Sequence, residues 1–526
     1  MAACLLGAIS TNAQSAFDLY SISQTDLKGT ARFMSMAGAF GALGGDLSTL
    51  NQNPGGIGIY RGSELGATFD WNIKNTTIDN QYKIKDRNFN FNNIGYIGSF
   101  RTNNRIVPYI NWGFSYSKTA SFKRRYGGQI ANIGNSMTNY VANQSAGWYA
   151  DELGYVADKY NPYQSSYAPW MSILAYNAYL INPANTDGNL YSGLYQPNHS
   201  SGYGEMEVEE SGAVNEYSVS LGGNVLDKVY FGATLGITDI DYNLYSYYGE
   251  SIDNALVPYV ANDKFFYGDG NAAWGMENLF SMSGTGVNFK LGAIIKPVNE
   301  LRIGLAFHTP TFYSLKSQYY ANASARFSSY DLQTTHDLST FEETDDGYIG
   351  ETTFEAKTPW RFMGSIAGVI GGRGILSFDY ERVVYDGMRV SYDNVEDREV
   401  SGYVKQYFKA SDIFRIGGEF KVTPQFSVRA GYSHQTSPVT EELSSDAIDV
   451  VTAGTTLSYT LDNKIQYYTA GLGYRYKAFY LDFAYVHKKR DSDYHAFSSE
   501  EGQPLPPIAK VKDANNEIVF SLGFKF

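Results

Sequence analysis

Alternating apolar and polar residues dominate the chain from Glu64 to Phe526, where about fourteen segments show the two-residue period of a β-strand. Short connections follow the even-numbered segments and long connections follow the odd-numbered ones. The short connections are Arg101–Pro108, Val225–Lys228, Pro297–Glu300, Gly371–Arg373, Thr423–Pro424 and Lys477–Ala478. In an up-and-down meander this order places every tight turn at one end and every long loop at the other. Such an asymmetry is typical of a bacterial outer-membrane β-barrel, with periplasmic turns and extracellular loops.

The two faces of these segments differ in chemistry. In the last segment, Ile518, Phe520 and Leu522 share one face, whereas Ser521 and Lys525 lie on the other. A soluble antiparallel protein would turn the apolar face inward, but the opposite face carries charges and many glycines, which suits a wet lumen. The aromatic content, 16% with 45 Tyr, exceeds the need of one core and fits aromatic belts at two membrane interfaces. The residues predicted to face lipid are Phe231, Leu235, Phe307, Val428, Leu472, Phe483 and Leu522.

The composition supports one domain in a membrane rather than several soluble ones. No Pro/Ser-rich linker interrupts residues 64–526, and no run approaches the ~20 apolar residues of a membrane-spanning helix. The net charge of -13 and the lack of a basic, aromatic-rich patch argue against nucleic acid as a partner. We therefore predict an all-β fold, a single 14-stranded antiparallel transmembrane barrel formed by residues 64–526.

Residues 1–13 resemble a secretory signal that lacks its basic first part, which makes Gln14 the expected mature start. The only cysteine, Cys4, lies in this apolar run. A lipoprotein anchor at Cys4 is the alternative, but the residues after it stay apolar instead of opening a polar tether. The mature chain would then contain no cysteine.

Residues 14–63 have no strand period, and Lys28–Tyr60 is rich in Gly, Ala and Met. Fourteen strands enclose a hole that side chains of the wall do not fill. We predict that this segment plugs the lumen as a hatch, and a flexible periplasmic tail is the alternative. The apolar residues Phe33, Met36 and Phe40 are candidate ligand contacts, and Asn53-Pro54-Gly55 is the predicted hatch turn.

Several blocks of sequence resemble the FadL/TodX family of outer-membrane transporters of hydrophobic compounds. Met36–Tyr60 is similar to the family's hatch signature, with Asn53-Pro54-Gly55 in place of its Asn-Pro-Ala turn. Gly284–Lys316 is similar to its central hairpin, and Arg415–Val439 to its late hairpin. The resemblance implies a 14-stranded barrel with a lumenal hatch and passive uptake of a long-chain fatty acid or similar lipid. It also implies a kink in the third strand, here Tyr109–Thr119 with Gly113, and a groove between partly helical extracellular loops.

Two predicted loops are rich in aromatic residues. The loop 120–213 is far longer than a connection requires and contains helix-like stripes of apolar residues. Such stripes either pack on one another or line a ligand groove. The loop Gly249–Ser283 would form a second wall of that groove. The candidate ligand contacts are Trp148, Trp170, Met171 and Tyr176 in the first loop and Phe265 and Trp274 in the second.

Charged residues are expected on the lumenal face of the strands. Arg302 and Arg429 are candidates to hold the carboxylate of a ligand, because a guanidinium matches two oxygens. The alternative is a lattice of paired charges that ties the wall together. The run Glu342–Asp346 lacks the ordered spacing of a calcium loop and is interpreted as a solvated acidic face. The predicted lumenal charges are Lys290, Arg302, Arg415, Arg429 and Arg475 with Asp379, Glu381, Glu419 and Asp482.

Three other functions remain as alternatives: a haem receptor, a surface scaffold and, least favoured, an outer-membrane hydrolase. A haem receptor would use His199 or His336 in loops, and a hydrolase needs a nucleophile beside an oriented base. The six histidines show no paired spacing, so no catalytic residue, cofactor or metal site is predicted. The expected partners are a hydrophobic ligand, outer-membrane lipid and lipopolysaccharide, and the barrel-assembly machinery, which would read the C-terminal Phe526. The protein is expected to be a monomer.

Overall fold

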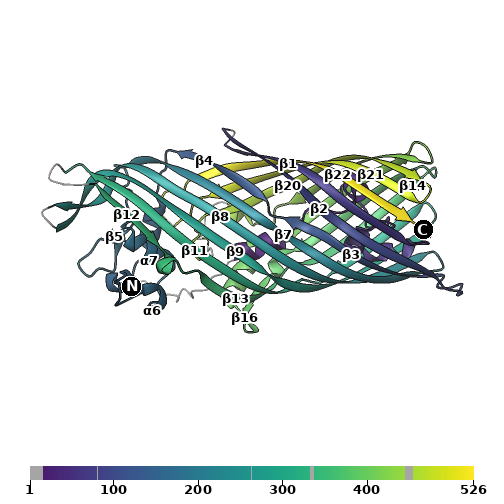
Figure 1. Ribbon diagram of the computed structural model, residues 1–526, viewed down its shortest axis with the longest axis horizontal. Helices are drawn as coiled ribbons and strands as arrows, with labels where there is room; N and C mark the ends of the chain where they lie inside the picture. The colour runs from purple at the N-terminus through teal and green to yellow at the C-terminus, as the bar shows by residue number, and fades with distance from the viewer. Residues whose placement is uncertain are drawn as a thin grey trace.

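The computed structural model describes residues 16–79, 81–261, 264–331, 337–444, 450, 454–500 and 502–526. The predicted signal, residues 1–13, lies outside these residues, as do Gln14 and Ser15. The fold is a closed antiparallel barrel of 14 strands (Figure 1). Among the described helices, none is both long and apolar enough to cross a membrane.

Each barrel strand pairs with its neighbours in the chain, and β1 pairs with β22 to close the barrel. Several strands are interrupted; β11 continues β10, and β14 continues β13. The strands are β1 (Glu64–Ile78), β2 (Tyr82–Arg101), β3 (Tyr109–Ser121), β7 (Ser201–Val225), β8 (Val229–Ala261), β9 (Lys264–Val298), β10 (Leu301–His308), β11 (Phe312–Ser329), β13 (Gly350–Lys357), β14 (Trp360–Ile370), β15 (Gly374–Val384), β18 (Ser411–Lys421), β19 (Phe426–Thr436), β20 (Tyr459–Tyr476), β21 (Phe479–His495) and β22 (Ile508–Lys525).

The predicted short connections all lie at one end of the barrel, which we call the short-turn end, and the opposite end is the long-loop end. The alternation of faces is also confirmed. On β8, Phe231, Leu235 and Ile237 are exposed on the outer surface, whereas Thr234 and Thr238 are buried inside. The other residues predicted to face lipid are exposed or half-buried on the outside as well.

Two of the predicted long loops are wrong, because the strands on either side simply continue as hairpins. The β1–β2 pairing runs up to Ile78↔Tyr82, and the β8–β9 pairing up to Ala261↔Lys264. Gly249–Ser283 is therefore hairpin and not loop. Likewise β7 begins at Ser201, inside the predicted loop 120–213. The reason is that the inward residues of these extensions, such as Met206 and Trp274, are buried against the helices of the loop between β3 and β7.

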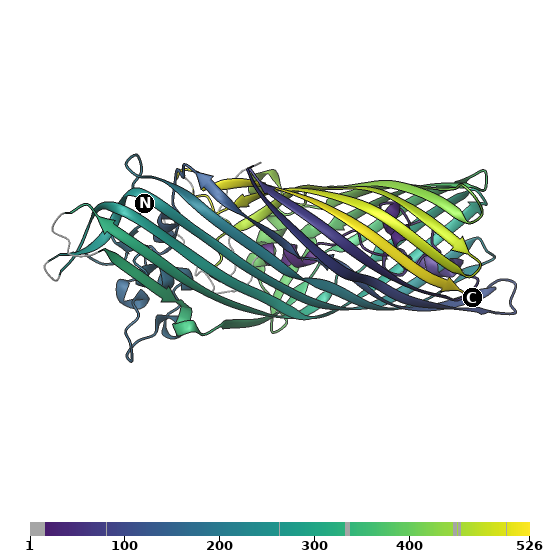
Figure 2. The same cartoon turned by 45° about the horizontal axis from the view of Figure 1, so that its top comes forward.

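The extended strands and the helices beside them form a lobe at the long-loop end, which projects beyond the rest of the barrel (Figure 2). Helices are confirmed within the predicted loop, but they are short, and part of the predicted loop forms the strand β4 instead. The elements of this loop lobe are β4 (Arg124–Ala131), α4 (Met137–Gln144), α5 (Ala150–Leu153), α6 (Pro162–Ser165), α7 (Trp170–Asn177), β5 (Asn182–Pro183), β6 (Tyr191–Ser192), β12 (Leu338–Glu343) and η2 (Thr344–Gly347).

The remaining elements are at the long-loop end or inside the barrel. Those at the end are η3 (Tyr385–Gly387), β16 (Arg389–Tyr392), β17 (Val395–Glu396), α8 (Arg398–Tyr407) and α9 (Glu441–Ser444). Those of the N-terminal segment, residues 16–63, are α1 (Ala16–Ser23), α2 (Ala31–Ser35), α3 (Thr49–Gln52) and η1 (Pro54–Ile59). This segment is buried within the barrel, where α2 and η1 contact strands on opposite sides of the wall.

Candidate functional site

The Asn-Pro-Gly turn of the N-terminal segment is docked directly on the backbone of the wall. Asn53 shapes the turn, because its Oδ1 accepts a hydrogen bond from the Gly55 amide at 3.0 Å and its Nδ2 donates to the Ala293 carbonyl at 3.3 Å. A Cβ at Gly292 would lie 1.9 Å from Asn53 Oδ1, and one at Gly232 would lie 2.1 Å from the Pro54 carbonyl oxygen. The turn can approach β8 and β9 this closely only because the wall has glycine there.

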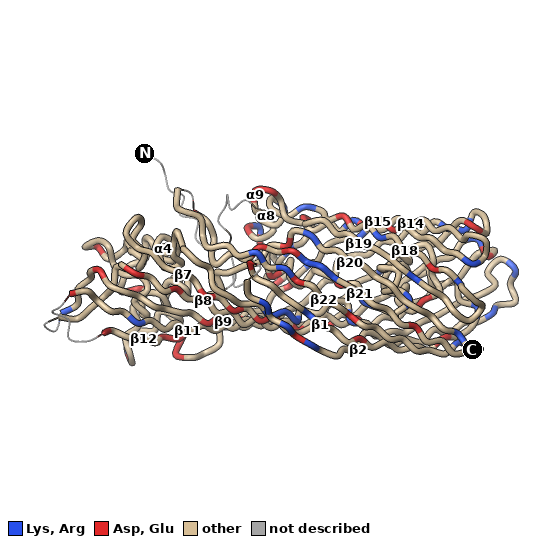
Figure 3. The backbone as a smooth tube through the Cα atoms, turned by 90° about the horizontal axis from the view of Figure 1, so that it is seen from above, with Lys and Arg blue, Asp and Glu red and all other residues tan. Residues whose placement is uncertain are grey.

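Ion pairs fix the rest of the N-terminal segment to the wall. Lys28 Nζ lies 3.1 Å from Asp70 and 2.9 Å from Glu517, and Asp26 lies 2.5 Å from Lys488 Nζ. Burial disfavours the charge of Lys28, but attraction by Glu517 and Asp70 outweighs that cost and raises the pKa of Lys28 above its ordinary value. Basic and acidic residues gather at this level of the barrel, near β20, β22 and β1 (Figure 3).

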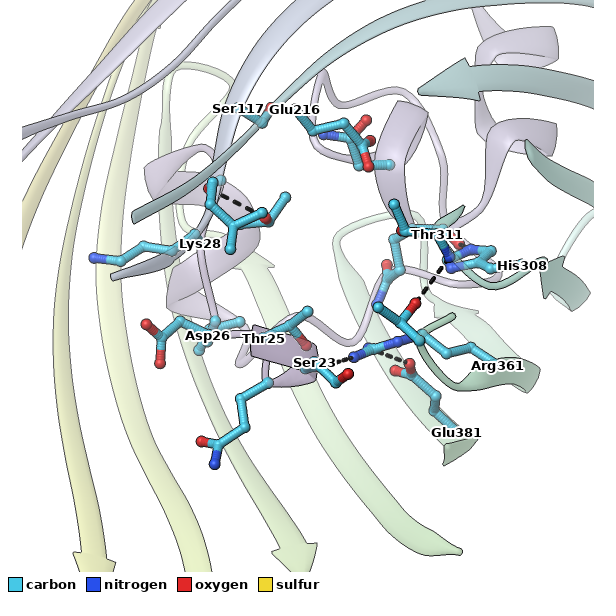
Figure 4. Close-up of a pocket in the computed structure, with 18 of the residues that line it drawn as sticks. Ser23, Thr25, Asp26, Lys28, Ser117, Glu216, His308, Thr311, Arg361 and Glu381 are labelled. Atoms are coloured by element: carbon cyan, nitrogen blue, oxygen red, sulfur yellow. Dashed lines mark hydrogen bonds and ion pairs between the residues drawn. The ribbon is translucent and has the colours of Figure 1, made fainter. Parts of the chain in front are cut away.

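A cavity of about 190 Å³ lies between the N-terminal segment and the wall (Figure 4). Residues 22–29 line one side, and residues from β3, β7, β8, β9, β10 and later strands line the other. Several charged groups around it are already paired. Lys290 pairs with Glu216, and Arg361 and Arg415 both pair with Glu381, at 3.0 and 2.6 Å. His308 Nε2 lies 2.8 Å from the Gln52 carbonyl oxygen.

The same cavity also has an apolar strip. It consists of side chains from the N-terminal segment and from the wall, and it leaves space for a hydrocarbon group beside the paired charges. The apolar residues of the lining are Ile22, Leu27, Phe33, Val214, Tyr313, Met363 and Ile413.

Two smaller cavities adjoin this one along the N-terminal segment. A cavity of about 90 Å³ is lined by Phe17, Tyr20 and Gln24 and lies nearer the long-loop end, and Gln24 also lines the main cavity. A cavity of about 50 Å³ shares Asp26 and Lys28 with the main cavity and reaches β1 and the residues that follow β3. Residues 17–29 therefore line an interrupted series of spaces rather than an open channel.

The pairing of β2 with β3 stops beside this site. It ends at Asn93↔Ser117, although β2 continues on to Tyr82. Beyond that point β3 pairs only with β7, and a bulge lies between Lys118 and Ala120. The predicted irregularity of the third strand is therefore at Lys118–Ala120, and not at Gly113, which sits in regular pairing with Ile97 and Ser220.

Lys118 comes directly before the bulge and lines the cavity at the point where β3 no longer pairs with β2. Its Nζ donates to Asn90 Oδ1 at 3.3 Å, and among the described residues no carboxylate lies within ion-pair distance of it. Among the described residues, Lys118 is thus a lumenal cation without a carboxylate partner. Along β3 it alternates with the buried Ser117, so the sequence pattern alone gives no sign that it lines the cavity.

The sequence-predicted ligand contacts lie in different places. Phe33 lines the main cavity, whereas Met36 and Phe40 are fully buried in the packing of the N-terminal segment. Arg302 donates to the Leu43 carbonyl at 2.8 Å, and Arg429 pairs with both Glu419 and Asp482. Arg429 is therefore paired as the lattice alternative expected, whereas Arg302 is held by a backbone carbonyl.

The candidate ligand contacts predicted in the loops are mostly packed into a hydrophobic core and do not line a groove. Met171 and Trp274 are buried, and Trp148, Trp170 and Tyr176 pack against the same cluster. Phe265 is exposed and stacks on Tyr179, with ring centroids 5.4 Å apart. In the acidic run, Asp345 accepts hydrogen bonds from Asn161 and Gln164, and Asp346 accepts one from Tyr155, so these carboxylates fasten the loop to the lobe. Among the described residues no group of three or more His, Cys, Asp or Glu could hold a metal ion.

Solved structures share this fold. The crystal structure of a Pseudomonas aeruginosa FadL homologue is 11% identical, with a TM-score of 0.54 over 95% of this chain and 99% of the other. A deltaS2 mutant of the TodX monoaromatic hydrocarbon channel is 14% identical, with a TM-score of 0.50 over 95% and 100%. No protein-family model and no curated protein matches the sequence. At these identities the comparison establishes the fold, which is the one implied by the resemblance to FadL/TodX transporters.

Proposed function

We propose that the protein is an outer-membrane transporter that lets hydrophobic small molecules pass without an energy source. The observation that carries this proposal is the lumenal cavity, which joins an apolar strip to the unpaired Lys118 and is closed by the N-terminal segment. The outward apolar band of the strands suits a bilayer. In the usual orientation of outer-membrane barrels, the short turns would be periplasmic and the loop lobe would be outside. The solved proteins that share the fold are described as a FadL homologue and a monoaromatic hydrocarbon channel.

The ligand chemistry follows from the lining. Burial of an acyl chain yields ~0.8 kcal/mol per CH₂, so about eight buried carbons would yield ~6 kcal/mol before ordering costs. Lys118 supplies a charge for a carboxylate head, which favours a long-chain fatty acid over a neutral hydrocarbon. The N-terminal segment acts as a hatch, and its movement would open either a periplasmic exit or a lateral one where β2 and β3 part.

Reconstituted vesicles test this function. We expect flux of a long-chain fatty acid, and no flux of a polar sugar of similar mass. Lys118→Gln should weaken binding of the fatty acid by about tenfold, the loss of one charge-assisted contact, and leave binding of its methyl ester unchanged. Lys489→Gln, on the outer face over Tyr468, is the matched control. Equal flux of sugar would make the protein a general porin, whereas a Soret band or ester hydrolysis by the purified protein would favour haem binding or an enzyme.

The C-terminal residue offers a separate prediction about assembly. The Phe526 amide donates to the Ser63 carbonyl at 2.9 Å, and the Phe526 carbonyl accepts from the Ser63 amide at 2.7 Å. The last residue therefore extends the pairing of β22 with β1 that closes the barrel. Its ring is exposed and packs near Phe524. Deletion of Phe526 should reduce the amount of protein inserted in the outer membrane, measured by surface labelling. Insertion equal to that of the full chain would show that the assembly machinery does not read this end.

A further inference from the structure

A groove of about 540 Å³ crosses the outer surface of the extended wall, where β7, β8, β9 and β11 rise above the apolar band. It lies outside the barrel and shares no residue with the lumenal cavity. Gly347 and Ile349, from the loop that follows β12, bound the groove beside β11. Two rows of outward side chains line the groove, and a third row lies next to them on the same strands.

The strand register sets these rows. Tyr245 stands opposite Leu279, and Leu279 stands opposite Tyr320, so the middle row presents two rings with an exposed leucine between them. Strands are about 4.8 Å apart, so the two tyrosines are about 10 Å apart across the row. The row nearer the apolar band is Ser211, Asn243, Ser281 and Gln318, and the row farther from it is Glu207, Tyr247, Glu277 and Asn322.

Hydrogen bonds hold the groove in place. The Tyr245 hydroxyl donates to Glu277 at 3.2 Å, and Asn322 Nδ2 donates to the other oxygen of Glu277 at 3.0 Å. The Tyr320 hydroxyl donates to Glu343 at 2.8 Å. Two aromatic rings are thereby flanked on both sides by amides, hydroxyls and carboxylates that can still accept or donate. A pyranose ring has matching chemistry, with an apolar face of C–H groups and a rim of hydroxyls.

The height of the groove restricts what can reach it. Along β8, Ile237 is the last large apolar residue of the outward band before Asp239 and Asp241. At about 3.3 Å per residue and a tilt of about 40°, Tyr245 lies about 20 Å above Ile237. Phospholipid headgroups extend only about 5–8 Å beyond the hydrocarbon. The carboxylate of Glu277, whose hydrogen-bond donors Tyr245 and Asn322 are neutral, also disfavours phosphate groups, whereas Glu207 and Glu209 pair with Arg125.

We propose that this groove binds neutral sugars in the outer part of the saccharide carried by an outer-leaflet glycolipid. The proposal rests on the outer-membrane orientation given under the proposed function, but not on what passes through the lumen. Its span of about 10 Å accommodates two sugar rings, one on each tyrosine. Binding there would orient the lobe relative to the membrane surface.

Native mass spectrometry of the full-length protein in mild detergent tests this site. The probes are lipopolysaccharide with a complete core saccharide and lipopolysaccharide truncated after its innermost sugars. We expect retention of the complete form only, and displacement by its core oligosaccharide released with mild acid. Tyr245→Ala combined with Tyr320→Ala should weaken retention by about tenfold, whereas the corresponding double Phe variant keeps the rings and most of the binding.

Tyr203→Ala is the matched control, because Tyr203 is an exposed outward tyrosine of β7 outside the groove. Equal retention of both glycolipids, or unchanged retention by the double Ala variant, would overturn the proposal. A co-purifying protein lost only in the double Ala variant, without sugar binding, would also overturn it and mark a protein interface. Fatty-acid flux of the double Ala variant should equal that of the unaltered protein, so failure of this site and failure of the transport function are separate results.

Discussion

Cross-linking the N-terminal segment to the wall should abolish flux of a hydrophobic substrate. The pair Gly41→Cys and Ser365→Cys suits this test, because a Cβ at Gly41 would lie 2.9 Å from Ser365 Cβ. A disulfide needs about 3.5–4.5 Å between Cβ atoms, so the segment must shift by about 1 Å. The only cysteine in the sequence, Cys4, lies in the predicted signal and should not compete. Flux in vesicles should fall at least about tenfold when the disulfide forms, since the cavity opens only if the segment moves.

The same protein after reduction is the control for the strain that the two substitutions introduce, and it should recover flux. Gly41→Ser with Ser365 unchanged is a second control. A shift in mass without reductant verifies the cross-link. Undiminished flux through the fully cross-linked protein would show that the segment is not a gate.

A charge on the outer face of the barrel should destabilise the protein strongly. Leu235 is exposed in the apolar band of β8, so Leu235→Arg places a charge in the hydrocarbon and should lower the free energy of unfolding by ~2–4 kcal/mol. Urea unfolding in lipid vesicles measures this change. Thr234 is a poor lumenal control, because its hydroxyl donates to the Leu50 carbonyl at 2.9 Å beneath the N-terminal segment.

Gln435→Arg is a better control, because Gln435 is half-buried in the lining of the main cavity, where an added guanidinium can stay hydrated. We expect its free energy of unfolding to stay within about 1 kcal/mol of the unaltered protein. Equal destabilisation by the two substitutions would contradict the assignment of the faces.

The unpaired Lys118 shows why the candidate site could be predicted only in part. The lumenal charges named from the sequence are mostly paired, as for Arg429 between Glu419 and Asp482, because charges that face the same narrow lumen neutralise one another. Lys118 escaped prediction because it lies where β3 loses its partner β2, and no local pattern shows where a ladder ends. The cavity itself joins residues far apart in the chain, such as Ile22 and Ile413, which no local pattern relates.

The sequence by itself determined the strands, their order, which connections lie at the short-turn end, and which face of each strand is apolar and points outward. These features follow from the alternation of apolar and polar residues and from the lengths of the connections, which are local properties of the chain. It also predicted that residues 14–63 differ from the strands of the wall. Tertiary structure decided where the hairpins end, since the extensions of β8 and β9 are stabilised by packing on distant helices. It also decided which charges are paired and where the ladder between β2 and β3 breaks, because both depend on which residues meet across the lumen and between strands.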